Sequence, residues 1–141
     1  AAAHLARGGS PDVIGRLTGE LRAGEPRRVA FEDKTLIGHV SFIDHFGNVI
    51  TNIHRSVFKE FGKGRDFEID MRTPRMGIRE IHSGYQDVPA GERVAVFNHA
   101  GFLEIAINNH SAPGGRGGAD TLLGLNRDHA IRVRFIDEDT L

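Results

Sequence analysis

Apolar and polar residues alternate along most of the chain after residue 28, with the two-residue period of β-strands. In residues 66–72 the alternation is clean, because Phe67, Ile69 and Met71 share one face and charged residues share the other. Residues 34–43 carry apolar side chains on both faces, which indicates a strand that is buried on both sides. Five more segments fit the same period, which makes about seven short strands; they are residues 48–53, 77–82, 93–97, 102–107 and 130–136.

Helical signals are concentrated at the N-terminal end. Residues 10–12, Ser-Pro-Asp, supply a capping residue, a proline at the first helical position and an acid in the first turn. Apolar residues then recur at helical spacing, at Ile14, Leu17 and Leu21, although two glycines interrupt the pattern. We predict helical and connecting material over residues 1–24, and one or two helical turns over residues 56–61 with Ser56 as the cap.

Short strands joined by glycine-rich connections predict an antiparallel sandwich or barrel. The connections hold too little helix for the repeated crossovers of a parallel sheet. Closure into a barrel would also remove exposed strand edges. We therefore predict an all-β domain over residues 29–141, entered by a helical connection over residues 1–28.

Composition narrows the class of protein. The 141 residues are 39% hydrophobic and 26% charged, as in an ordinary globular domain. Eighteen Lys and Arg against 19 Asp and Glu give a net charge of −1, without the basic excess of nucleic-acid-binding proteins. The sequence has no apolar run near the ~20 residues of a membrane span, and no signal-peptide pattern. We expect a soluble, cytoplasmic domain that binds neither nucleic acid nor membrane.

Metal and nucleophile chemistry find little support in the sequence. There is no cysteine, hence no disulfide framework, thiolate zinc site or cysteine nucleophile. Three of the eight histidines, His39, His45 and His54, lie close in sequence, but no His-Glu-x-x-His pair is present. We expect no metal site. The glycine-rich residues 111–118 lack the lysine and hydroxyl of a phosphate-binding loop, so we interpret them as a mobile surface loop.

The most informative segment is residues 43–53, Ile-Asp-His-Phe-Gly-Asn-Val-Ile-Thr-Asn-Ile. Asp44, Phe46 and Asn48 set a carboxylate, an aromatic ring and a carboxamide around one glycine. A purine needs an aromatic platform and an amide donor and acceptor, and a carboxylate can bind an ammonium group or ribose hydroxyls. The alternative is a strand–turn–strand in which Asp44 and Asn48 bond the turn backbone. On these residues alone, that alternative is the simpler one.

A resemblance to a known family favours the ligand-binding interpretation of this turn over the purely structural one. Residues 38–55, Gly-His-Val-Ser-Phe-Ile-Asp-His-Phe-Gly-Asn-Val-Ile-Thr-Asn-Ile-His-Arg, resemble the signature of the S-adenosyl-L-methionine (SAM) hydroxide adenosyltransferase family. These enzymes are adenosine-forming SAM hydrolases, and the bacterial fluorinase and chlorinase are their relatives. Residues 97–108, Phe-Asn-His-Ala-Gly-Phe-Leu-Glu-Ile-Ala-Ile-Asn, resemble a second family block, Asn-Ser-x-Gly-x-Leu-Glu-Ile-Ala-x-Asn. Residues 122–125 resemble its closing element, and residues 4–8 resemble the connection into its C-terminal domain.

The resemblance implies a fold and a division of labour. The chain resembles the C-terminal domain alone, which in relatives is a small Greek-key β-barrel. The family's N-terminal α/β domain, which carries the Asp, Arg and His thought to activate water, has no counterpart here. In relatives the active sites of a homotrimer lie between the N-terminal domain of one subunit and the C-terminal domain of its neighbour. The resemblance therefore implies no catalytic residue in this chain, and no activity from this chain alone.

The implied reaction is attack of water or hydroxide on the ribose C5′ of SAM, giving adenosine and L-methionine. SAM is the substrate, so no separate cofactor is implied. By the resemblance, Phe46 packs against the adenine, Asn48 bonds its polar edge and Asp44 faces the methionine ammonium. Tyr85 matches a position where an aromatic ring closes over the base.

The remaining matched positions either depart from the family's residue type or would act through their backbone. His99 falls where relatives usually have a serine near the methionine carboxylate, and the backbone around Asn108 and Asn109 would meet the adenine edge. Halide-using relatives often carry an aromatic residue in place of Ile50, which favours a hydrolase. The alternative function is a non-catalytic β-barrel that binds an adenine-containing ligand or mediates oligomerisation.

Overall fold

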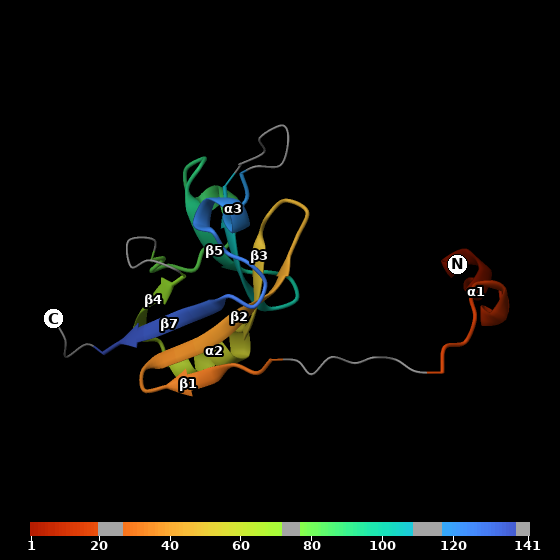
Figure 1. The fold of residues 1–141 in the computed structure, drawn as a ribbon, viewed down its shortest axis with the longest axis horizontal. Coiled ribbons are helices and arrows are strands. Elements are labelled where there is room, and N and C mark those ends of the chain that lie inside the picture. The colour runs from red at the N-terminus through yellow and green to blue at the C-terminus, as the bar shows by residue number, and fades with distance from the viewer. Residues whose placement is uncertain (20–26, 72–76, 109–116, 138–141) are drawn as a thin grey trace.

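In the residues that the structure describes, seven strands form one curled antiparallel sheet (Figure 1). In this computed structural model, residues 1–19, 27–71, 77–108 and 117–137 are described. The strand order is β4-β7-β2-β3-β6-β5, and β1 pairs with β2 at the outside. The strands are β1 (Ala30–Glu32), β2 (Thr35–Ile43), β3 (Val49–His54), β4 (Asp66–Asp70), β5 (Arg93–Phe97), β6 (Phe102–Ile107) and β7 (Ala130–Ile136). The predicted all-β fold is confirmed, and β5, β6 and β7 begin and end where the alternation predicts.

Three connections join strands that are not neighbours, from β3 to β4, from β4 to β5 and from β6 to β7, and they produce the non-sequential strand order. The strand predicted at residues 77–82 does not form as a strand. Ile78 instead makes an isolated bridge to Ile69 of β4, and His82 makes one to Val96 of β5. The segment runs from one edge strand to the other rather than alongside either, so it pairs once at each end. It thereby joins the two edges of the curled sheet.

The helices are short: α1 (Ala2–Ala6), η1 (Pro11–Val13), α2 (Arg55–Gly62), η3 (Tyr85–Asp87) and α3 (Ala119–Leu123). Helix α2 corresponds to the helix predicted at residues 56–61, but its cap is His54 and not Ser56. The His54 ring accepts a hydrogen bond from the backbone N–H of Ser56 at 3.2 Å. Because the imidazole already fills the capping position, the helix starts before the serine.

The N-terminal helical pattern is only partly realised. Ser10 caps η1 as predicted, accepting from the backbone N–H of Asp12 at 3.3 Å. The helix does not continue through Ile14 and Leu17, and Leu17 is 97% exposed. Without packing partners, an apolar stripe interrupted by glycines gains too little to hold a helix. Leu21 lies outside the described residues, as does most of the glycine-rich loop predicted at residues 111–118.

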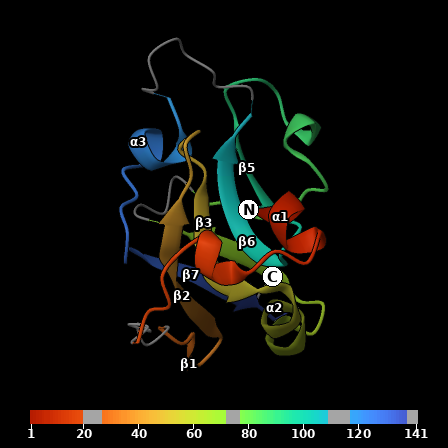
Figure 2. The same ribbon diagram turned by 90° about the vertical axis from the view of Figure 1, so that its right-hand side faces the viewer.

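The core fills the inside of the curl, and α2 covers one of its ends. Phe58 of α2 packs edge-on against Phe67, Phe97 and Phe135, with ring centroids 5.0, 5.4 and 5.3 Å away. Helix α3 and the turn between β2 and β3 lie at the opposite end from α2 (Figures 1 and 2). One end of the sheet is therefore closed by α2 and its cluster of phenylalanine rings, and the other end carries α3 and the turn between β2 and β3.

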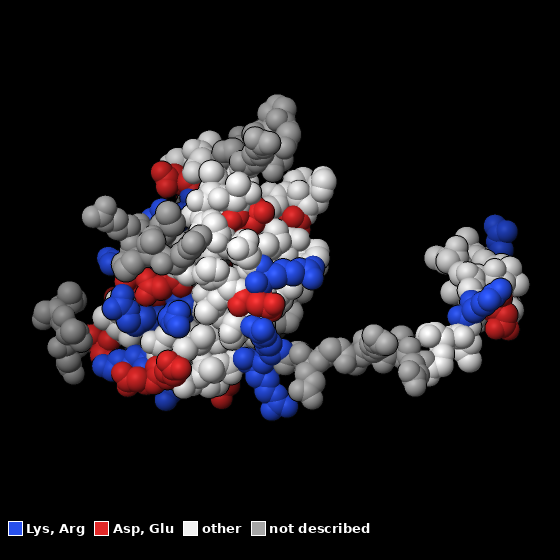
Figure 3. Space-filling model, in the orientation of Figure 1, with Lys and Arg blue, Asp and Glu red and all other residues white. Residues whose placement is uncertain are grey.

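Charged side chains of both signs stand next to one another on the face shown in Figure 3. Over β4 and β7 they form ion pairs, such as Arg134 to Glu68 at 2.6 Å. Near the ends of β2 and β7, Lys34 and Arg65 both pair with Asp137, at 2.7 and 3.2 Å. In the described part of the chain, no helix is long and apolar enough to cross a membrane.

Candidate functional site

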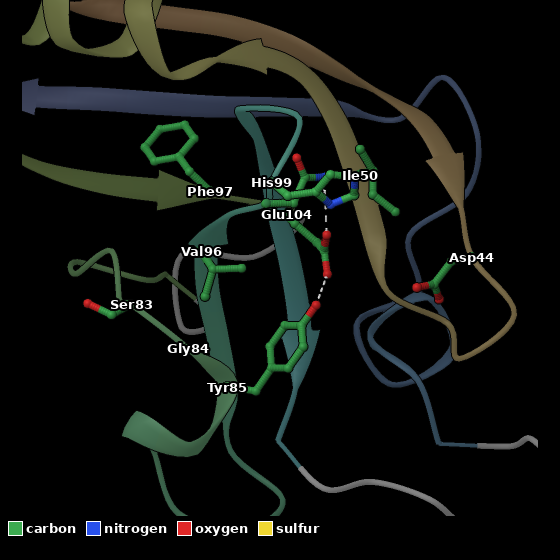
Figure 4. A pocket seen from close by; sticks show the side chains of 10 residues that line it. Asp44, Ile50, Ser83, Gly84, Tyr85, Val96, Phe97, His99 and Glu104 are labelled. Atoms are coloured by element: carbon green, nitrogen blue, oxygen red, sulfur yellow. Dashed lines mark hydrogen bonds between the residues drawn. The ribbon is translucent and has the colours of Figure 1, made fainter.

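A pocket of about 510 Å³ opens on the face of β3, β6 and β5 that points away from the main core (Figure 4). Its floor is a row of directly paired residues, because Glu104 of β6 lies opposite Ile50 of β3 on one side and Val96 of β5 on the other. The segment before η3 forms one wall with Tyr85, and Asp44 lines the pocket from the β2 side. Pairing of three strands thus fixes the floor, while two connections shape the rim.

Glu104 and Tyr85 are joined across the pocket wall. The carboxylate is only 5% exposed, and it accepts hydrogen bonds from the Tyr85 hydroxyl and from the side-chain amide of Asn98, the latter at 3.2 Å. Burial, together with the hydrogen bond and charge of Glu104 and the charge of Asp44, raises the pKa of Tyr85 well above its usual range. Tyr85 therefore keeps its proton and acts as a hydrogen-bond donor at neutral pH.

Asn98 also shapes the turn between β5 and β6 that carries His99. Its side-chain oxygen accepts from the backbone N–H groups of Ala100 and Phe102, both at 3.1 Å. His99 stands exposed at this turn and lines the pocket. One asparagine therefore connects the buried carboxylate to the loop that presents the imidazole.

The turn between β2 and β3 is organised by its own aspartate. One carboxylate oxygen of Asp44 accepts from the backbone N–H groups of Phe46 and Asn48, both at 2.9 Å. The other accepts from the side-chain amide of Asn48 at 3.0 Å. Asp44 thus bonds the turn backbone, as in the alternative that the sequence left open, whereas the side-chain amide of Asn48 donates to Asp44 itself. The side chain of Asp44 nevertheless lines the pocket.

Helix α3 holds this turn in place through two glycines. Gly47 has a φ of +79°, and its carbonyl accepts from the backbone N–H of Asp120 at 3.0 Å. A Cβ at Gly47 would lie 2.7 Å from the Cα of Gly118, so the two backbones are in direct contact. Only glycine at both positions permits this approach. The turn is thus anchored rather than free.

The structure brings three of the residues proposed from the sequence to one pocket: Asp44, Tyr85 and His99 line it. Phe46 and Asn48 share the turn with Asp44 but are not among the lining residues. Phe46 lies at the tip of the turn, 74% exposed, where its ring is accessible to a planar group. Asn48 is partly buried, with its amide directed to Asp44.

The two remaining asparagines lie elsewhere. The side chain of Asn108 donates to the carbonyl of Val88 at 2.6 Å, where it fastens the end of β6 to the segment after η3. It does not line the pocket. Asn109 lies outside the described residues.

Glu104 is the site residue that reasoning from single residues missed. The available signal was a lone carboxylate inside an otherwise apolar strand, residues 102–107. With Asp44 it places two carboxylates at the pocket, and the imidazole of His99 is the one basic side chain among the lining residues. This balance favours a cationic ligand. Within the described residues, no group of three His, Asp or Glu side chains has the arrangement of a metal site.

Comparison with known proteins gives a consistent picture. Residues 38–132 match the model of a family described as the SAM hydroxide adenosyltransferase C-terminal domain. The chain is 33% identical over 115 residues to a fluorinase of Nocardia brasiliensis, covering 75% of this chain and 38% of the relative. It is 31% identical over 134 residues to an (R)-S-adenosyl-L-methionine hydrolase of Thermus thermophilus, covering 94% of this chain and 45% of the relative.

Solved structures show the same fold. An uncharacterized conserved protein from Thermotoga maritima aligns with a TM-score of 0.64 and 28% identity, over 94% of this chain and 48% of its own. A conserved hypothetical protein from Thermus thermophilus aligns with a TM-score of 0.54 and 29% identity, over 96% of this chain and 48% of its own. The chain spans less than half the length of each of these four proteins.

Proposed function

The chain belongs to the SAM hydroxide adenosyltransferase family, and from this membership we propose that it is the SAM-binding domain of an enzyme that hydrolyses SAM to adenosine and L-methionine. One observation carries the proposal. Within the residues that match the family, two carboxylates line a pocket beside a turn that presents an exposed aromatic ring. A nucleoside sulfonium needs both, an aromatic platform for its base and negative charge for its cationic end.

In the proposed reaction, the oxygen of a water or hydroxide forms a bond to the ribose C5′ as the C5′–S bond breaks. The bonding electron pair passes to sulfur, methionine leaves as a neutral thioether, and the proton of the attacking water goes to solvent. Because sulfonium is already a good leaving group, no acid is needed to protonate it, and no separate cofactor is used. Catalysis then depends on alignment and on removal of solvent from the nucleophile.

The residues of this chain would bind and align the substrate. We assign the adenine face to Phe46 and its polar edge to Asn48, and the methionine ammonium to Asp44. Tyr85 would close over the base from the opposite wall of the pocket. The exposed imidazole of His99 would meet the methionine carboxylate, as a hydrogen-bond donor when neutral and as an ion pair when protonated.

The backbone at Asn108 and Asn109 would meet the adenine edge. We assign the activation of water to an N-terminal α/β domain of a neighbouring subunit, in a cytoplasmic homotrimer. Relatives more than twice as long as this chain support a second domain. On this proposal the 141-residue chain by itself binds ligand without turning it over.

The similarity to a fluorinase suggests a second candidate reaction, in which a halide attacks in place of water. We favour water because Ile50, at the pocket floor, stands where halide-using relatives often carry an aromatic residue.

The test uses the complete product of the coding sequence, incubated with SAM in ¹⁸O-labelled water with and without fluoride or chloride. The proposal predicts adenosine that carries the label at its 5′ oxygen, in equal amount with and without halide. A halogenated nucleoside would establish the second chemistry instead. SAM left intact after long incubation would overturn both, and turnover by the 141-residue chain alone would overturn the division of labour.

A further inference from the structure

Glu104 occupies a costly position. It lies in the middle of β6, paired across the sheet with Ile50 on one side and Val96 on the other, and it is 5% exposed. Both donors that reach its carboxylate, the Tyr85 hydroxyl and the Asn98 amide, are neutral. No Lys or Arg side chain pairs with it in the part of the chain that the structure describes. A buried carboxylate without a cationic partner lowers stability, even when neutral groups donate hydrogen bonds to it. A side chain that served only to hold the fold together would gain nothing from this charge.

The Glu104 carboxylate holds two parts of the pocket through its two hydrogen bonds. Through Tyr85 it fixes the ring that forms the pocket wall, because the hydroxyl must point at the carboxylate to donate (Figure 4). Through Asn98 it fixes the turn that presents His99. The carboxylate itself belongs to the pocket lining, opposite Asp44. Its negative charge is therefore directed at the space where a ligand would lie.

We propose that Glu104 is a specificity-determining residue that holds Tyr85 and Asn98 at the pocket wall and selects ligands with a positive charge. The inference rests on the proposed function for the identity of that ligand, a nucleoside sulfonium. Both carboxylates attract the cation before cleavage. After cleavage the products are a neutral thioether and a neutral nucleoside, for which Glu104 has no electrostatic preference. The same residue therefore favours substrate binding and product release.

The first arm of the test needs no ligand. Tyr85 is the only tyrosine of the 141 residues and there is no tryptophan, so ultraviolet absorbance reports the ionisation of this one phenol. In the 141-residue chain, Glu104→Gln is expected to lower the pKa of Tyr85 from its raised value. Glu32→Gln, which removes the same charge from an exposed position on β1, is expected to leave it unchanged. An unchanged titration in Glu104→Gln would overturn the claim that Glu104 holds Tyr85.

The second arm measures binding by the complete protein, at low temperature and before turnover. The two ligands are SAM and S-adenosylhomocysteine, which share the nucleoside and the amino acid but differ in the charge on sulfur. Glu104→Gln is expected to weaken SAM about tenfold more than S-adenosylhomocysteine, which corresponds to about 1.4 kcal/mol. Tyr85→Phe keeps the carboxylate and should affect both ligands alike. Equal losses in Glu104→Gln would overturn charge selection.

Glu104→Asp serves as the rescue variant, because it keeps the charge but draws it back from Tyr85. It is expected to retain the preference for SAM while the pKa of Tyr85 falls; loss of that preference would contradict the charge assignment. Failure of the proposed function has a different signature. If the unaltered protein binds neither SAM nor S-adenosylhomocysteine, the ligand assignment fails, while the tyrosine titration still decides whether Glu104 holds the ring.

Discussion

Replacement of Gly47 by alanine tests whether contact with α3 fixes the binding turn. At Gly47 the φ is +79°, and a Cβ would lie 2.7 Å from the Cα of Gly118 and 2.5 Å from a carboxylate oxygen of Asp120. Gly64 is a matched control, because its φ is also +79° but a Cβ there has nothing within 4 Å. The two substitutions therefore share backbone strain and differ in steric contact.

The magnitudes follow from that difference. An alanine held in the left-handed region costs about 1–2 kcal/mol at either position. At Gly47 the new methyl group also meets backbone that cannot rotate away, and such overpacking typically costs about 1–3 kcal/mol more. We expect Gly64→Ala to lower the free energy of unfolding by about 1–2 kcal/mol and Gly47→Ala by about 2–5 kcal/mol.

Chemical denaturation of both variants measures these free energies, and calorimetry with adenosine measures the consequence for binding. Because Gly47 lies between the proposed ligand contacts Phe46 and Asn48, its variant should also lose adenosine affinity, whereas Gly64→Ala should not. Equal destabilisation of the two variants would refute the claim that contact with Gly118 anchors the turn. Unchanged adenosine affinity in Gly47→Ala would show that anchoring is not needed for binding.

Three further predictions concern single side chains. Asp44→Asn should weaken SAM more than adenosine, because only SAM carries the ammonium; calorimetry that finds equal losses would contradict this role. Asn48→Ala should weaken adenosine by about 1–3 kcal/mol by leaving a polar edge unpaired, and an unchanged affinity would remove Asn48 from the site. The raised pKa of Tyr85 means that the folded chain keeps a proton which the unfolded chain loses above about pH 10. The stability from this group should be complete below that pH and decline above it, and Tyr85→Phe should have a shallower decline in denaturation series; identical slopes would contradict the shift.

Much of the sheet was predictable because its strands are amphipathic or buried on both faces. The strand that failed, residues 77–82, has an alternating pattern but crosses between two sheet edges, and a local pattern does not reveal such a path. Strand β1 and helix α3 are too short to show a period. The helix expected through Ile14 and Leu17 did not form because helical spacing does not supply a packing partner.

For the site, the sequence identified the turn but not its surroundings. Asp44 and Asn48 were recognisable as turn or ligand residues, and the structure shows the turn bonds directly. The position of Tyr85 against Glu104 joins residues 19 apart in sequence, and depends on strand register that periodicity does not fix. The side-chain amide of Asn108 donates to the carbonyl of Val88, and this contact between residues 20 apart is likewise not visible in the sequence pattern.

A crystal structure of the complete protein soaked with adenosine and L-methionine would show where the two products bind. We expect the adenine to lie against the ring of Phe46 and the amino acid to be directed toward Asp44, with both products beside the pocket bounded by Tyr85 and Glu104. Products bound at another surface, with this pocket left to solvent, would contradict it.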